Sequence, residues 1–130
     1  MNKGDAGMTI QELYAKIGGN YEQAQKIMKM DKLIDRYVRK LAASGTYEKL
    51  AEAGKTMDAA LLFEAAHAMK GVCANLGLDT LSRAAGEITE EFRPGSARKM
   101  TDAEIREKLA ALGDMYQKTV KGIEEYAAEA

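Results

Sequence analysis

The sequence predicts an all-α protein, an antiparallel up-and-down four-helix bundle with short accessory N-terminal helices. The chain has 130 residues, enough for a single domain with one hydrophobic core, and a single proline. Four substantial segments carry apolar residues at intervals of three and four, which is the spacing of one buried helix face. Short breaks separate these segments, and short connections favour antiparallel neighbours.

Composition also excludes several classes of function. The chain is 46% hydrophobic and 30% charged, with a net charge of −1. This balance is ordinary for a globular domain and supports neither nucleic acid nor an anionic membrane as a partner. No apolar run approaches the roughly 18–20 residues that span a bilayer, and the N-terminus lacks the apolar core of a signal peptide. We therefore expect a cytoplasmic protein, and the single cysteine fits a reducing compartment.

The chain is expected to begin with a flexible lead-in over residues 1–8, followed by a single domain over residues 9–130. Thr9 and Glu12 have the spacing of a capping box, in which two side chains satisfy free backbone N–H groups at the start of a helix. A short accessory helix is predicted from there to the glycine pair at 18–19, because glycine favours the left-handed conformation that ends helices.

The first long helix of the predicted bundle runs from Tyr21 to about Ala43. Its apolar positions step by three and four: Ile27, Met30, Ile34, Tyr37 and Leu41. A second short segment follows over residues 46–53, and Gly54 is expected to end it.

The central helix is predicted from Thr56 or Asp58 to Leu76, with Gly77 as its left-handed C-terminal cap. At about 100° per residue, its apolar residues fall in one stripe. The stripe consists of Leu61, Leu62, Ala65, Ala66, Met69, Val72, Cys73 and Leu76. The only histidine, His67, lies nearly opposite the middle of this stripe, so we expect its side chain in solvent.

Two further helices complete the predicted bundle. Asp79 is expected to cap the first, whose apolar face is Leu78, Leu81, Ala85, Ile88 and Phe92. Residues 94–96 form the clearest loop, and a second capping box at Thr101 and Glu104 opens the last helix. Its stripe is Ile105, Leu109, Leu112, Tyr116, Thr119 or Val120, and Ile123. The six tyrosines are expected at the rim of the core with their hydroxyls in water.

Position on the helix tests four other interpretations of His67. A core histidine would lie on the opposite face of the helix. No metal is expected, because a metal site needs companion ligands, the chain has no second histidine, and Cys73 lies about 240° around the helix. The same angle argues against a catalytic dyad with Cys73. An inert surface histidine stays open on position alone.

The neighbours of His67 form the spacing H-x-x-K-G-x-x-x-x-x-G with Lys70, Gly71 and Gly77. A neutral imidazole near pH 7 is a nucleophile that can accept a phosphoryl group. A lysine at i+3 is its neighbour on the helix surface, where it can meet the added negative charge. A glycine at i+4 removes a side chain that would block another protein, although it costs ~1 kcal/mol relative to alanine in a helix.

One stretch of the chain resembles the signature of histidine phosphotransfer (HPt) domains, the phosphoryl carriers of multistep two-component relays. It reads AAHAMKGVCANLGL over residues 65–78, and the surrounding helix plan agrees over roughly residues 9–127. The resemblance implies that His67 takes a phosphoryl group from a receiver-domain aspartate and passes it to another receiver. It also implies that Lys70 steadies the phosphoryl group and that Gly71 gives clearance. The implied partners are response-regulator receiver domains and a hybrid sensor kinase.

The exposed face around His67 is expected to be a docking surface for the receiver. Its residues are Gly71, Phe63, Glu64, Ala60 and Ala74, which lie within about 60° of His67 on the wheel. Phe63 could instead fold onto the accessory helix, and Glu64 could be a solvated charge. Arg83 on the following helix is a candidate for added positive potential near the site.

The end of the motif contains Asn75 and Gly77. Asn75 either holds the helix terminus or is a simple cap residue, and the sequence leaves both open. Where many relatives have a small polar residue after the K-G pair, this chain has Val72 and Cys73. The wheel buries both, so we expect altered packing with the transfer chemistry intact.

The leading hypothesis is a phosphoryl carrier without autonomous kinase activity, because the partner's aspartyl phosphate supplies the chemistry and the chain shows no glycine-rich nucleotide loop. No cofactor is expected. The rival hypothesis is a non-phosphorylated helical adaptor or dimerisation module. A third, an enzyme with His67 as general base, lacks a second catalytic group. A monomer is expected, although Phe63 could serve a homodimer and the sequence leaves the oligomeric state open.

Overall fold

The computed structural model describes residues 7–129, and the regular secondary structure in this range is entirely helical. The helices are α2 (Ile10–Ile17), α3 (Tyr21–Met28), α4 (Asp31–Ala43), α5 (Thr46–Thr56), α6 (Ala59–Asn75), α7 (Asp79–Glu91) and α8 (Asp102–Glu129). The all-α prediction is confirmed. Most of the predicted lead-in, residues 1–6, lies outside the described residues.

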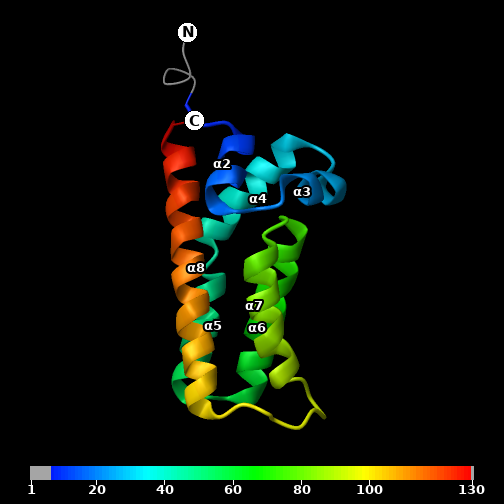
Figure 1. The fold of residues 1–130 in the computed structure, drawn as a ribbon, viewed down its shortest axis with the longest axis vertical. Helices are drawn as coiled ribbons and strands as arrows, with labels where there is room; N and C mark the ends of the chain where they lie inside the picture. Colours follow the sequence, from blue (N-terminus) through cyan, green and yellow to red (C-terminus); the bar gives the residue numbers. More distant parts are fainter. Residues whose placement is uncertain (1–6, 130) are drawn as a thin grey trace.

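Helices α5, α6, α7 and α8 lie side by side, and α2, α3 and α4 lie at the end of the molecule where α8 terminates (Figure 1). The longest helix, α8, joins these two parts because it contacts α2 and α4 as well as α5 and α7. The broadest contact is between α6 and α7. These two helices run in opposite directions, since Ser82 donates a hydrogen bond to the Lys70 carbonyl while Arg93 lies against Phe63.

The prediction of one helix from Tyr21 to Ala43 is wrong. Lys29 adopts a left-handed conformation with φ of 74°, and Met30 is extended, so the chain turns between α3 and α4. The carboxylate of Asp31 accepts hydrogen bonds from the Tyr21 hydroxyl and the Gln25 amide across this turn. The turn brings α3 against α6. Three residues of the predicted stripe are therefore exposed, namely Ile27, Met30 and Tyr37.

The prediction that Gly54 ends a two-turn segment is also wrong. Helix α5 continues through Gly54 to Thr56, and Gly54 is buried. A Cβ at this position would lie 2.6 Å from Cδ1 of Leu109 on α8. The missing side chain therefore lets α5 approach α8 closely. As a result, α5 lies beside α6, α7 and α8 and is not one of the short accessory helices.

Both predicted capping boxes are confirmed. The Thr9 N–H donates to the Glu12 carboxylate at 2.8 Å, and the Glu12 N–H donates to the Thr9 hydroxyl at 3.1 Å. Thr101 and Glu104 make the same reciprocal pair, at 2.9 and 3.1 Å. The predicted faces of α7 and α8 are buried, with Val120 half-buried. Leu78, not Asp79, occupies the cap position of α7.

Three tyrosines are buried more deeply than the rim position predicted for them: Tyr14, Tyr116 and Tyr126. The Tyr14 hydroxyl donates to the Leu76 carbonyl at 2.7 Å, and the Tyr116 hydroxyl donates to the Leu41 carbonyl at 3.2 Å. Each hydroxyl bonds a carbonyl in the last turn of a helix or at its cap, where carbonyls lack the usual i+4 partner; the Leu41 carbonyl also accepts from Ser44. These bonds connect α2 to α6 and α8 to α4.

Candidate functional site

His67 lies in the middle of α6 with its side chain exposed. The buried residues of the helix are Leu62, Ala66, Met69 and Cys73. Leu61 and Val72, which the wheel placed in the buried stripe, are 50% and 39% exposed. The prediction that Val72 is buried is therefore wrong, whereas Cys73 is fully buried.

Phe63, one turn before His67, is half-buried and packs against the core. Its ring also stacks on the imidazole, with 5.5 Å between ring centroids and 8° between the planes. Two residues beyond the end of α7, the Arg93 guanidinium lies 5.4 Å from the centroid of the same ring. Phe63 thus contacts both the core and His67, an arrangement that its position in the sequence does not indicate.

Lys70, one turn after His67, is half-buried along its aliphatic part. A Cβ built on Gly86 of α7 would lie 3.5–4.0 Å from three carbons of the Lys70 side chain. The lysine stem therefore runs over the space that Gly86 leaves open. Within residues 7–129 the Lys70 ammonium forms no ion pair, so its charge is available to a ligand.

The helix face beside the imidazole is open. Gly71 is exposed, and a Cβ built there would have nothing within 4 Å. Ala60 and Glu64 are also exposed, while Ala74 is half-buried. Another protein can reach this face without displacing a large side chain.

The end of α6 is closed by backbone contacts. Asn75 is the last residue of the helix, exposed, and without a side-chain hydrogen bond in the described part of the chain. Gly77 has φ of 67°, and a Cβ there would lie 2.2 Å from the Asn20 carbonyl oxygen. Gly77 therefore provides both the left-handed conformation and the close approach of α6 to the start of α3.

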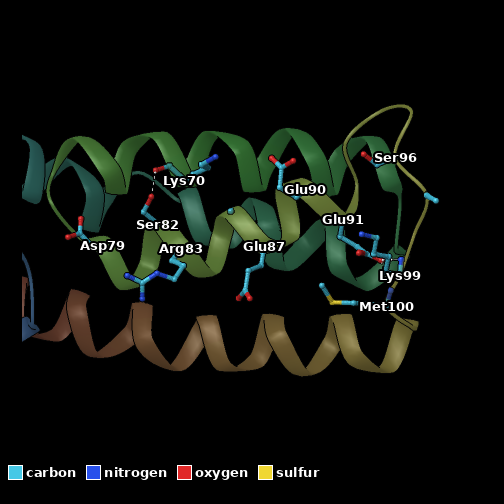
Figure 2. Close-up of a pocket in the computed structure, with 12 residues that line it drawn as sticks. Lys70, Asp79, Ser82, Arg83, Glu87, Glu90, Glu91, Ser96, Lys99 and Met100 are labelled. Atoms are coloured by element: carbon cyan, nitrogen blue, oxygen red, sulfur yellow. Dashed lines mark hydrogen bonds between the residues drawn. The ribbon is translucent and has the colours of Figure 1, made fainter.

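A groove of about 830 Å³ lies along α7, and Lys70 forms part of its wall (Figure 2). Both acidic and basic residues line it. Arg83 points toward α8 and away from Lys70, whereas Glu90 reaches toward α6. The carboxyl pKa of Glu90 is lowered, first by hydrogen bonds from Arg93 and then by the nearby charges of Lys70 and His67. Glu90, Arg93 and Gly86 are residues of the site that sequence reasoning missed.

Cys73 is an inert thiol by position and chemistry. Burial excludes it from solvent and raises its pKa to about 12, and only the thiolate is a good nucleophile. No cluster of three or more metal-binding side chains occurs among the described residues. Within the same range, no helix combines the length and apolar character that crossing a membrane requires.

Taken together, these features define an all-helical domain that presents its single histidine on an open helix face, beside a lysine that forms no ion pair in the described part of the chain. A family model described as the Hpt domain matches residues 21–121, and the chain therefore belongs to the Hpt domain family. Domains of this family carry phosphoryl groups on histidine in phosphorelays, interact with response-regulator receiver domains, and are not kinases. Comparisons with curated proteins and with solved structures return no match.

Proposed function

We propose that His67 accepts a phosphoryl group from the phosphorylated aspartate of one receiver domain and passes it to the aspartate of another. The observation that carries this proposal is the exposed imidazole in the middle of α6, with Lys70 and Gly71 beside it, inside the region that matches the Hpt family. We also propose that α5 to α8 are the antiparallel up-and-down four-helix bundle of this family, within a single domain over residues 9–130.

The chemistry is a displacement at phosphorus. An imidazole nitrogen of His67 attacks the phosphorus atom of the acyl phosphate, and a P–N bond forms while the bond from phosphorus to the aspartate oxygen breaks. The carboxylate leaves with the bonding electron pair. Onward transfer is the reverse reaction with a second receiver. The partner supplies the reactive bond, so the chain needs no kinase activity of its own.

Lys70 supplies positive charge where negative charge arrives. Its ammonium lies one helical turn from His67 and lacks an ion pair in the described range. It can therefore donate charge-assisted hydrogen bonds to the phosphoryl oxygens without first breaking another contact. This role is electrostatic, so Lys70 holds the phosphoryl group and takes no part in bond formation.

The receiver is proposed to dock on the face formed by Gly71, Phe63, Glu64, Ala60 and Ala74. This face combines the half-buried ring of Phe63 with small side chains and one carboxylate. Leu61 and Val72 are also exposed, but they lie about 120° and 140° around the helix from His67 and are outside this face. We propose that the carrier acts as a monomer, because self-association through this face would cover His67. We also propose that the receiver of a hybrid sensor kinase is among its partners.

The experiment is phosphoryl transfer in both directions with purified receivers. The wild-type protein should take label from a phosphorylated receiver and deliver it to a second one. The label should be acid-labile and base-stable, as a phosphoramidate is. His67→Gln should abolish transfer while circular dichroism shows unchanged helicity. Retained transfer in that variant would remove His67 from the mechanism, whereas a wild-type protein that takes no label would favour the non-phosphorylated adaptor.

A further inference from the structure

The side chains of Arg93, Phe63 and His67 are in successive contact. The ring of Phe63 stacks on His67 at 5.5 Å, nearly parallel, and the Arg93 guanidinium lies 5.4 Å from the Phe63 centroid. Both distances fall within the ranges of attractive aromatic and cation–π contacts. The proposed transfer chemistry uses neither Phe63 nor Arg93 as a reacting group, so their contacts need a separate explanation.

Arg93 is itself held in place by Glu90, which precedes it by three residues. The guanidinium Nη2 lies 2.6 Å from one carboxylate oxygen, and Nε lies 3.0 Å from the other. Such a two-point contact fixes the orientation of the guanidinium plane as well as its position. The side chain of Arg93 remains 41% exposed, so burial alone does not hold it.

An exposed histidine on a helix would otherwise rotate freely about its side-chain bonds. Stacking against Phe63 restricts the imidazole plane, and the core restricts Phe63, which packs against it. A nucleophile whose orientation is fixed before the reaction does not lose that freedom in the transition state. The effect on rate is therefore a consequence of geometry and does not require direct contact with the phosphoryl group.

We propose that Glu90, Arg93 and Phe63 are positioning residues that fix the imidazole plane of His67 and thereby raise its rate of phosphoryl acceptance. This inference rests on the proposed function of His67. It differs from the docking role expected for Phe63, because the positioning effect should appear even with a donor too small to dock.

Phosphoramidate is such a donor. The His67 nitrogen attacks its phosphorus atom, a new P–N bond forms, and the old P–N bond breaks to release ammonia. Phe63→Leu and Arg93→Gln should each slow this reaction by roughly two- to tenfold, the cost of ordering one side chain during the reaction. Phe63→Leu should also shift the proton resonances of the His67 ring in NMR spectra, because the ring current of the stacked phenyl group is lost.

Arg98→Gln is the matched control. Arg98 also lies over a phenylalanine ring, at 4.9 Å from the centroid of Phe92, and it is paired with Asp102 at 3.0 Å. The charge change is the same, but none of these contacts involves His67. This variant should keep both the wild-type rate and the wild-type His67 resonances. Arg93→Lys separates charge from geometry, because lysine keeps the charge without the planar two-point contact, and it should be slow like Arg93→Gln.

The outcomes distinguish this inference from the proposed function. Wild-type rates in Phe63→Leu and Arg93→Gln, with wild-type protein labelled normally, would overturn the positioning role alone. A wild-type rate in Arg93→Lys would show that charge, not orientation, is what Arg93 supplies. If phosphoramidate and receivers both fail to label the wild-type protein, the proposed function fails. The positioning arrangement is still tested in that case, since unchanged His67 resonances in Phe63→Leu would show that the stack does not form.

Discussion

At the residue scale, Lys70 is held by two residues of α7, Gly86 and Ser82. Its stem runs over Gly86 on α7, its carbonyl accepts a hydrogen bond from Ser82 at 3.1 Å, and its ammonium stays free of ion pairs within residues 7–129. The position of the charge is therefore set by packing, while the charge itself remains available. The stem of Lys70 therefore contributes to packing, and its ammonium contributes positive charge to the site.

Lys70→Ala should shorten the lifetime of the phosphorylated protein or slow transfer by roughly tenfold, the value of one charge-assisted hydrogen bond at a partly exposed site. The melting temperature should change little. Gly86→Leu should have a similar effect on phosphoryl retention, because the new side chain occupies the path of the lysine stem. Gly86→Ala is the control, since its Cβ would make only ordinary contacts at 3.5–4.0 Å. A large loss of thermal stability in Lys70→Ala would contradict this assignment.

Gly71 tests whether clearance matters. Gly71→Leu places a bulky side chain one turn from His67 in open space, where a Cβ meets nothing within 4 Å. Folding should be unaffected or slightly improved, because leucine is a better helix former than glycine by ~0.8 kcal/mol. Transfer from a receiver should slow by roughly tenfold, the equivalent of about 1.4 kcal/mol of lost docking. Gln117→Leu on α8 is the control, because it adds the same exposed side chain elsewhere. Equal slowing of transfer in this variant would mean that the added leucine acts nonspecifically and not by blocking the His67 face.

At the scale of the element, the C-terminal end of α6 is held by three hydrogen bonds. The Leu78 N–H donates to the Cys73 carbonyl at 2.9 Å, and the Asn20 N–H donates to the Gly77 carbonyl at 2.7 Å. The Tyr14 hydroxyl bonds the Leu76 carbonyl. The last two contacts join α6 to α3 and α2, so the helix that carries His67 is fixed at its C-terminal end.

Gly77→Ala should destabilise the protein more than Gly18→Ala. Both glycines are left-handed, with φ of 67° and 71°, and an alanine in that conformation costs about 1–2 kcal/mol. Only at Gly77 would the added Cβ also meet backbone, 2.2 Å from the Asn20 carbonyl oxygen, whereas Gly18 faces open space. Urea unfolding measures the difference. Equal losses in the two variants would mean that α6 and α3 are not in close contact.

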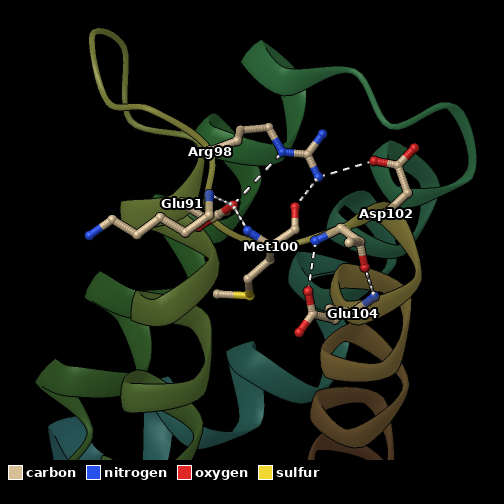
Figure 3. A network of polar contacts seen from close by, with 7 residues as sticks. Glu91, Arg98, Met100, Asp102 and Glu104 are labelled. Atoms are coloured by element: carbon tan, nitrogen blue, oxygen red, sulfur yellow. Dashed lines mark hydrogen bonds and ion pairs between the residues drawn. The ribbon is translucent and has the colours of Figure 1, made fainter.

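The segment between α7 and α8 is anchored by one buried carboxylate (Figure 3). Glu91 accepts hydrogen bonds from the backbone N–H groups of Met100 and Lys99, both at 2.7 Å. Arg98 lies 3.8 Å from the same carboxylate. These donors, Met100 first, hold the pKa of Glu91 below its usual range, because each stabilises the charged form.

Glu91 should therefore stabilise the fold at neutral pH and lose that effect in acid. A carboxyl pKa that is lower in the folded state contributes stability above the unfolded value of about 4.3, and the contribution disappears as the pH falls through the folded pKa. Glu91→Gln should lower the melting temperature at pH 7, with a difference from wild type that narrows below about pH 4. Glu107→Gln, at an exposed residue of α8, should show no such pattern. A difference that is constant with pH would rule out the charged form of Glu91 as the anchor.

At the scale of the whole molecule, patterns that act within one helix were predictable and those that act between helices were not. The capping boxes at Thr9 and Thr101 and the buried faces of α7 and α8 follow from spacing alone. Gly54 looked like a helix end but serves close packing against Leu109 on α8, a partner distant in sequence. The turn at Lys29 was missed because lysine rarely adopts a left-handed conformation, and tertiary contacts of α3 select it here.

In the candidate site, too, the contacts within one helix were predictable and the contacts between helices were not. His67, Lys70 and Gly71 share one face of one helix, so their geometry could be read from their spacing. Glu90 and Arg93 come from the end of α7, and no spacing in the sequence indicates that they meet Phe63 and His67. The wheel also misplaced the buried face of α6, because a single helix cannot show which neighbour covers it more broadly.

The central claim is that the phosphoryl group resides on His67. The most direct measurement is mass spectrometry of the protein after transfer from a phosphorylated receiver, under conditions that preserve phosphohistidine. We predict a gain of one phosphoryl group, localised to the peptide that contains His67. Localisation of the group to any other residue, or no gain in mass from a receiver that is shown to be phosphorylated, would contradict the account.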